Sequence, residues 1–139
     1  MDTAEFLRGT PLFASCSDKH VKSIARLARR RTVAAGEKII REDSQSTMGF
    51  YMLVEGSAVV TRGDHLLAEY APGDYFGEIA LLLDDTVRTA TVSAKTDVTV
   101  LVITRWDFRA LVKTNPEIAV ELMAVLAKRL ADTDRVLSE

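Results

Sequence analysis

Turn residues recur at short intervals through the middle of this 139-residue chain. Between residues 32 and 103, the segments that separate the turns are short and rich in residues that favour strands. The turn signals are Gly36, Gly49, Gly56, Gly63-Asp64 and Pro72-Gly73-Asp74. We predict strands at 38–41, 50–54, 57–62, 65–70, 88–94 and 97–103. Turns at this density favour an antiparallel barrel or sandwich.

Helical patterns flank this strand region on both sides. A first short helix contains Phe6 and Leu7, and 18–29 has the spacing of an amphipathic helix with Ser17 as its N-cap. We expect this second helix to end in Arg29, Arg30 and Arg31. Cations are favourable at a helix C-terminus, and a patch that binds a partner is the alternative interpretation.

The C-terminal part of the chain predicts two further helices. Residues 105–113 form the first, and Asn115-Pro116 opens the second with a good N-cap and a proline suited to the first helical position. The last helix carries a mainly apolar stripe that needs a partner, either the strand region or a second copy of the helix. Its members are Ala119, Leu122, Leu126, Leu130, Thr133 and Leu137.

Length and composition predict one folded domain over 1–139, since 47% of the residues are hydrophobic and 27% are charged. Within it we expect N-terminal helices over 1–31, strands over 32–103 and C-terminal helices over 104–139. The net charge of −2 gives no general attraction to nucleic acid or acidic lipid. Cys16 is the one cysteine, and the first ten residues lack an apolar core, so we expect a cytoplasmic protein without a disulfide.

Arg88 is the first residue that points to chemistry. By two-residue alternation, Arg88 shares a strand face with Ala90, Val92 and Ala94, whose small apolar side chains are typical of an inward face. A buried arginine needs an anionic partner, and a guanidinium group binds phosphate oxygens through two hydrogen bonds. A simple ion pair with Glu78, Asp84 or Asp85 is the alternative.

The segment 76–83 predicts a short helix that follows the turn at residues 72–74. Gly77 allows the backbone to approach a ligand, and the N–H groups of Glu78, Ile79 and Ala80 at the helix start can bind an anion. The Glu78 carboxylate would repel a phosphate there, so it is better suited to accept a hydrogen bond from a sugar hydroxyl. A turn glycine followed by a capping glutamate is the purely structural interpretation.

The combined string resembles the phosphate-binding cassette of the cyclic-nucleotide-binding domain family. The resemblance rests on 73–82 (GDYFGEIALL) and on Arg88-Thr89-Ala90-Thr91-Val92, and it extends over nearly the whole chain. It implies an antiparallel, jelly-roll-like β-roll with N-terminal helices, a short phosphate-binding helix within a cassette at 76–92, and C-terminal lid helices. Two positions differ from the family pattern: Val87 stands where many relatives have proline, and the loop 83–87 looks one residue longer than in kinase and channel relatives.

The resemblance also implies a ligand and a set of binding residues. The ligand is a cyclic nucleotide, cAMP in the first place and cGMP as a second candidate, and no other cofactor is expected. Arg88 and backbone N–H groups bind the cyclic phosphate, and Glu78 binds the ribose 2′-hydroxyl. Thr89 resembles a position where a hydroxyl helps to bind guanine. The complete set is Phe76, Gly77, Glu78, Ile79, Ala80, Arg88, Thr89, Leu130 and Thr133.

Leu130 and Thr133 belong to this set because 129–133 resembles the helix from which a threonine of catabolite activators reaches the adenine amino group. For Thr133, a tolerated surface threonine is the alternative interpretation. The last helix is thus predicted to act as a lid that moves when the ligand binds.

Other function classes have weaker support. His20 and His65 lie far apart in sequence, so we expect no metal site, and no catalytic triad or P-loop string is present. We therefore expect a sensor that is not an enzyme.

The chain ends at Glu139 without a helix-turn-helix, so by itself it is not expected to bind nucleic acid or a membrane. Open alternatives are the sensor half of a transcription regulator, or a regulatory piece of a channel or kinase-like protein. Its partner is a second copy through the C-terminal helix or an unknown effector.

Overall fold

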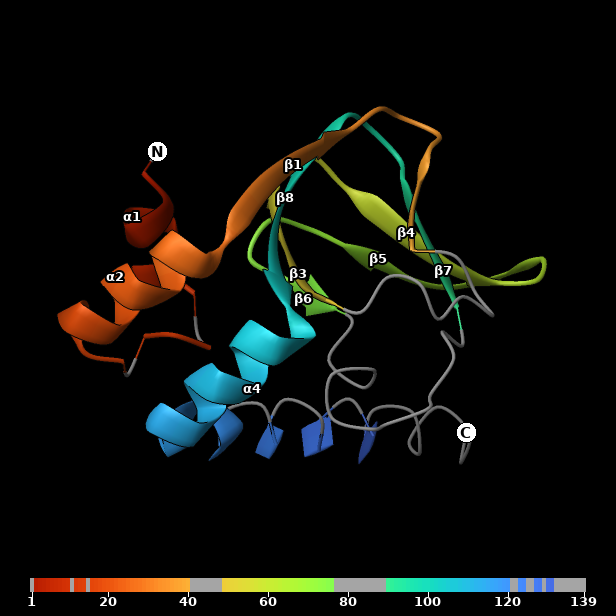
Figure 1. The fold of residues 1–139 in the computed structure, drawn as a ribbon. Helices are drawn as coiled ribbons and strands as arrows, with labels where there is room; N and C mark the ends of the chain where they lie inside the picture. The colour runs from red at the N-terminus through yellow and green to blue at the C-terminus, as the bar shows by residue number, and fades with distance from the viewer. Residues whose placement is uncertain are drawn as a thin grey trace. The chain divides into compact units, whose positions relative to one another are not determined.

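The computed structural model describes residues 2–10, 12–14, 16–40, 49–76, 90–120, 123–124, 127–128 and 130–131. The chain divides into two compact units, one formed by Met1–Ala25 with Ala110–Glu139 and the other by Arg26–Arg109. The elements, labelled in Figure 1, are α1 (Thr3–Arg8), α2 (Asp18–Leu27), β1 (Arg29–Val33), β2 (Lys38–Ile40), β3 (Gly49–Glu55), β4 (Ala58–Arg62), β5 (His65–Tyr70), β6 (Tyr75–Phe76), β7 (Thr91–Ala94), β8 (Val98–Thr104) and α4 (Arg105–Thr114).

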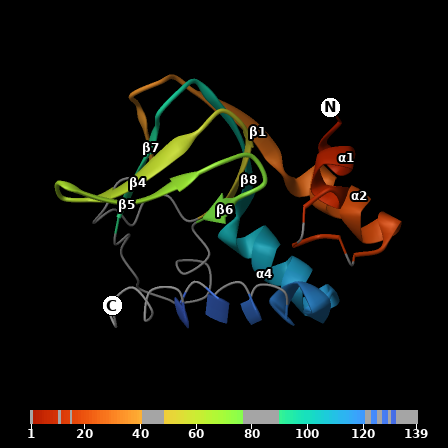
Figure 2. The ribbon, with the colours of Figure 1, turned by 180° about the vertical axis from the view of Figure 1, so that it is seen from behind.

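The unit Arg26–Arg109 contains two four-stranded sheets, which Figures 1 and 2 show from opposite sides. The first has the strand order β1-β8-β3-β6 and the second the order β2-β7-β4-β5. Every strand pair in both sheets is antiparallel. The prediction of a mainly antiparallel β architecture is therefore confirmed.

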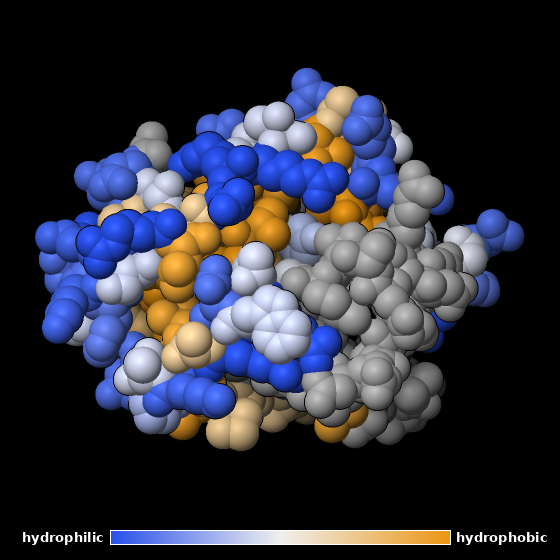
Figure 3. Space-filling view, in the orientation of Figure 1, coloured by the Kyte–Doolittle hydropathy of each residue, from blue (hydrophilic) through white to orange (hydrophobic). Residues whose placement is uncertain are grey.

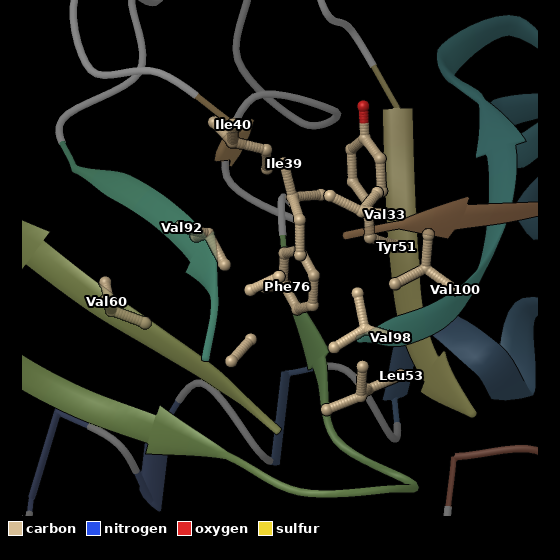
Figure 4. Close-up of a cluster of buried hydrophobic side chains, with 12 residues drawn as sticks. Val33, Ile39, Ile40, Tyr51, Leu53, Val60, Phe76, Val92, Val98 and Val100 are labelled. Atoms are coloured by element: carbon tan, nitrogen blue, oxygen red, sulfur yellow. The ribbon is translucent and has the colours of Figure 1, made fainter. Parts of the chain in front are cut away.

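Buried side chains from both sheets form one hydrophobic cluster, which Figure 4 shows in close-up. Alternation explains most of its membership, because residues two apart point to the same face. Strand β2 is an exception: it contributes the consecutive residues Ile39 and Ile40, where its register shifts. On β8 the members are Val98 and Val100, with Val102 packed against them, whereas Leu101 and Ile103 lie on the opposite face and are also buried. Strand β8 is thus largely buried on both faces in its central part.

The predicted strand positions agree closely with the observed ones. Strand β5 has the predicted bounds, and β3, β4 and β8 differ from the prediction by one residue at one or both ends. The turn glycines Gly36, Gly56, Gly63 and Gly73 were identified correctly, because all four have positive φ. Gly49 was also predicted to mark a turn, but it is the first residue of β3. The turns could be predicted where the local backbone conformation requires a glycine.

The three arginines at 29–31 form strand β1, so the prediction that they end a helix is wrong. Helix α2 ends at Leu27, and β1 pairs with β8, with Arg29 opposite Val102 and Arg31 opposite Val100. The predicted boundary at residue 31 between helices and strands therefore lies inside β1. Because β1 is an edge strand, its arginine side chains can extend into solvent, and Figure 3 shows hydrophilic side chains along it. Pairing with β8, which lies far along the chain, therefore decided the conformation of these residues against the helical pattern of the sequence.

Phe76 also departs from its predicted conformation. It belongs to β6, where it pairs with Tyr51 of β3, and not to a helix. The rest of the predicted helix, 77–83, lies outside the described residues.

The other unit contains α1, most of α2 and the start of the last helix. Its buried residues include Leu7, Phe13, Val21, Ile24 and Ile118. On its surface, Arg8 and Lys22 both form ion pairs with Asp18. Hydrogen bonds from both side chains hold the pKa of Asp18 below its ordinary value of 3.8, and the bond from Lys22 has the larger effect.

Ser17 is the N-cap of α2, as predicted. Its hydroxyl oxygen accepts a hydrogen bond from the backbone N–H of His20 at 3.2 Å. The last helix begins after Asn115, also as predicted, and residues 116–120, 123–124, 127–128 and 130–131 are helical. In the described part of the chain, no helix has the length and apolar character needed to cross a membrane.

Candidate functional site

Phe76 lies at the N-terminal border of the segment that the sequence marks as the binding site. Its side chain is only 2% exposed. Its ring is nearly parallel to two tyrosine rings, with its centroid 5.4 Å from that of Tyr51 and 5.1 Å from that of Tyr70. The Phe76 side chain is therefore part of the packed interior.

Strand β7 lies at the C-terminal border of the same segment. Val92 and Ala94 are buried in the hydrophobic cluster, and Ala90 packs against it. The predicted inward direction is therefore confirmed for Val92 and Ala94. The predicted start of this strand at residue 88 is wrong for Ala90, which forms a bend before β7. Because β7 pairs with β2 on one side and β4 on the other, this border is a central strand and is held by hydrogen bonds on both edges.

The interior of the roll is apolar in the part that the structure describes. Among the described residues, the buried polar ones are Thr10, Thr91 and Asn115, and none of them is charged. An anionic ligand inside the roll would need a positive partner, because burying a lone charge is costly.

Most of the predicted binding residues lie outside the described part of the chain. These are Gly77, Glu78, Ile79, Ala80, Arg88, Thr89 and Thr133. Of the two that are described, Phe76 is in the core, and Leu130 is helical with 64% of its surface exposed. Phe76 and Leu130 belong to different compact units.

The two histidines lie in different settings, and neither joins a metal-binding group among residues 2–131 as far as these are described. His65 is exposed at the start of β5. The Nδ1 atom of His20 lies 3.0 Å from Ser17 Oγ and 3.4 Å from Asn115 Nδ2. Asn115 Nδ2 also donates a hydrogen bond to Cys16 Sγ at 3.4 Å. These contacts link the segment before α2 to the start of the last helix.

The ring stack of Tyr51, Phe76 and Tyr70 was missed by the sequence analysis. Tyr51 and Tyr70 lie on predicted strands but were given no role, whereas Phe76 was placed in the predicted helix 76–83. Alternation within each strand could have suggested inward side chains. The rings meet because β3 pairs with β6 and because β5, in the other sheet, brings Tyr70 to Phe76, and neither arrangement has a signal in the sequence.

A cyclic nucleotide-binding domain model matches residues 30–115, which include both borders of the candidate site. The chain belongs to the cyclic nucleotide-binding domain family.

Members of this family with different overall architectures resemble the chain. A cyclic nucleotide-gated potassium channel of Rhizobium etli is 37% identical over 115 residues, which make up 83% of this chain and 32% of the channel. The crystal structure of the Thermus thermophilus catabolite activator protein has a TM-score of 0.83 at 30% identity and covers 93% of this chain. The regulatory domain of Toxoplasma gondii PKA, co-crystallised with cAMP, has a TM-score of 0.78 at 25% identity and covers 94%.

These similarities confirm the predicted family and its β-roll fold. They also show that this domain occurs in larger proteins, because the chain covers 62% of the Thermus structure and 49% of the Toxoplasma one. It spans about a third of the Rhizobium channel.

Proposed function

We propose that this cyclic nucleotide-binding domain is a sensor whose preferred ligand is cAMP and that the ligand phosphate is bound by Arg88. The observation that carries the proposal is the inward face of β7, where Val92 and Ala94 are buried, together with the half-buried Ala90, which packs against the same hydrophobic cluster from the bend directly before β7. Arg88 precedes Ala90 by two residues, so continued alternation directs its guanidinium group to the same side. Support for cAMP comes from the similarity to the Toxoplasma regulatory domain, whose structure contains that nucleotide.

The charge distribution supports the same assignment. No charged side chain is buried among the residues that the structure describes. The described part of the roll therefore contains no buried cation that could replace Arg88 as the partner of a phosphate. A bidentate guanidinium–phosphate pair would satisfy both ions at once. Backbone N–H groups of Glu78, Ile79 and Ala80 complete the phosphate site in this proposal.

The remaining assignments concern the sugar, the base and the response. Glu78 accepts a hydrogen bond from the ribose 2′-hydroxyl, and Thr89 allows weaker binding of cGMP. Leu130 and Thr133 contact the base from the last helix, which therefore changes position when the ligand binds. A ligand can shift a helix only through unequal contacts in its two positions, and the base supplies that difference.

In this proposal the domain performs no catalysis, acts in the cytoplasm and transmits its signal to another protein or to a second copy of the chain. The similarity to a channel, a catabolite activator and a kinase regulatory domain supports a sensory role within a larger assembly. The alternatives are that the domain forms the sensor half of a transcription regulator or a regulatory piece of a channel or kinase-like protein. Recovery of unchanged nucleotide after long incubation with the protein is the expected result for a non-enzymatic sensor.

Calorimetric titration with cAMP and cGMP tests the proposal directly. We expect both to bind, with cAMP the tighter ligand. Arg88→Ala should weaken cAMP binding at least about tenfold, because hydrogen bonds to charged groups are worth roughly 1.5–3 kcal/mol each. Glu78→Gln should weaken the binding of cAMP much more than that of 2′-deoxy-cAMP.

Arg29→Ala is the matched control, because Arg29 is an exposed arginine on the same roll. Its affinity for cAMP should equal that of the wild type. Equal affinities for the Arg88 and Arg29 variants would contradict the phosphate assignment. Equal losses of cAMP and 2′-deoxy-cAMP binding in Glu78→Gln would contradict the ribose assignment.

A further inference from the structure

Three consecutive arginines make up most of β1, the strand at one edge of the first sheet. Arg29, Arg30 and Arg31 are all exposed. Strand β1 pairs with β8 on one side, and no described strand pairs with its other side. Figure 3 shows the hydrophilic side chains along this strand. The proposed function gives none of these arginines a role.

The register of the sheet places Arg29 and Arg31 on the same face. Arg29 lies opposite Val102 and Arg31 lies opposite Val100. Residues directly opposite each other in an antiparallel pair have their side chains on one face of the sheet. Residues two apart in a strand are separated by about 7 Å, so the two arginine side chains leave the same edge at neighbouring positions.

These two guanidinium groups differ from other exposed cations of the chain. Lys22 forms an ion pair with Asp18, and Lys95 forms one with Glu69. Among the residues that the structure describes, neither Arg29 nor Arg31 forms an ion pair. Two like charges on adjacent positions of one face repel each other, and a bound anion would relieve that repulsion.

The spacing of the two arginines fits carboxylates on an extended chain. A guanidinium group binds a carboxylate through two parallel hydrogen bonds. In an extended segment, acidic residues at every second position share one face and have the same separation of about 7 Å. Two such carboxylates can therefore bind Arg29 and Arg31 together.

The surroundings of β1 favour a short anionic segment over a large anionic surface. Asp97 Oδ1 accepts a hydrogen bond from the N–H of Ala35, two residues beyond the end of β1, and Glu37 is exposed in the turn that follows. The chain as a whole has a net charge of −2. A membrane or a nucleic acid extends far beyond one strand and would be repelled by these carboxylates, whereas a short segment can avoid them.

We infer that Arg29 and Arg31 form a docking site for an extended acidic segment of a partner protein. This inference goes beyond the proposed function, which leaves the partner undefined, and it does not depend on which nucleotide binds. Charges on an edge strand also discourage pairing with other sheets, but a charge of either sign serves that purpose. Docking of an acidic segment requires positive charge, so reversing the sign separates the two roles.

The test measures fluorescence anisotropy of a fluorescein-labelled peptide in which glutamate alternates with threonine. The wild type should bind this peptide, with an affinity that falls as salt is added, because exposed charges are screened. Arg31→Glu and Arg29→Glu should each bind at least about fivefold more weakly, since an attraction becomes a repulsion. A peptide with lysine in place of glutamate should not bind.

Arg62→Glu is the matched control, because Arg62 is an exposed arginine at the end of β4 in the second sheet. It should bind the peptide like the wild type, and Arg31→Glu should keep the wild-type affinity for cAMP and elution volume in gel filtration. The docking site is overturned if the wild type does not bind the peptide, or if Arg31→Glu and Arg62→Glu weaken binding equally.

Two other anions are tested with the same proteins: vesicles of equal parts phosphatidylcholine and phosphatidylserine, and a DNA duplex. If either binds the wild type more tightly than the peptide and loses binding in Arg31→Glu, the partner is not an acidic protein segment. A wild type that binds the peptide but neither cAMP nor cGMP would overturn the proposed function and leave this docking site standing.

Discussion

Gly56 lies where the chain turns from β3 to β4, with a φ of +85°. A Cβ atom added there would lie 2.3 Å from the carbonyl oxygen of Asp97, 2.7 Å from Thr96 Oγ1 and 2.9 Å from Val98 Cγ1. The first of these contacts is with backbone, which cannot rotate away. Glycine is thus required at this position both for its conformation and for the close approach of the segment before β8.

Gly56→Ala should lower the free energy of unfolding by at least about 2 kcal/mol, since positive φ alone costs a side chain roughly 1–2 kcal/mol. Gly36→Ala is the control, because Gly36 has a φ of +87° but no atom within 4 Å of the added Cβ. The free energy of unfolding of Gly36→Ala should fall only by the cost of placing alanine at positive φ. Urea denaturation of both variants measures the difference, and equal losses would show that the close approach to Asp97 is unimportant.

At the scale of the elements, Asn115 joins α4 to the last helix and is 4% exposed. Its backbone N–H donates to the carbonyl of Leu111, and its own carbonyl accepts from the N–H of Ile118. Its side chain contacts Cys16 and His20, which lie nearly one hundred residues earlier. One residue thus combines a local role at the helix junction with a tertiary one.

Asn115→Ala should destabilise the helical unit by about 1–2 kcal/mol, because it removes a buried amide that donates to Cys16. Thr114→Ala is the matched control, since Thr114 is exposed and its hydroxyl bonds only to carbonyls of its own helix. Thermal unfolding followed by circular dichroism measures both. A loss for Asn115→Ala no greater than that for Thr114→Ala would mean that the contacts with Cys16 and His20 contribute nothing to stability.

At the scale of the whole molecule, the last helix carries large apolar side chains that are exposed. Val120 and Met123 are each 60% exposed, and Leu130 is 64% exposed. Exposed apolar residues grouped on one helix commonly mark a surface that another element or molecule covers. If the helix moves on ligand binding as proposed, these side chains have one environment in the ligand-free protein and another in the bound protein.

Hydrogen exchange of 123–137 should be slower with saturating cAMP than without it, because the helix gains contacts in the bound position. Strand β8 is the internal control: it lies between β1 and β3, and its exchange should stay slow in both states. Truncation after Leu122 should lower the affinity for cAMP and leave the roll folded. If exchange in 123–137 is identical with and without ligand, the helix is a static brace.

Local features of the sequence determined the turns, most strands and the helix starts. Positive φ at Gly36 and Gly56, the Ser17 cap and the inward alternation of Val92 and Ala94 each depend on a few adjacent residues. The family motif identified the candidate site in the same way, through a short string of residue types. The roles of its members Glu78 and Arg88 remain predictions.

Tertiary structure decided what depends on distant partners. Arg29, Arg30 and Arg31 form a strand because β8 is beside them, and Phe76 is in a strand because β3 pairs with it. Likewise, Tyr70 meets Phe76 only because two sheets enclose one interior, and the side chain of Asn115 meets Cys16 across 99 positions of sequence. A periodic pattern reports which face of an element is apolar, but the partner of that face is fixed only when the chain folds.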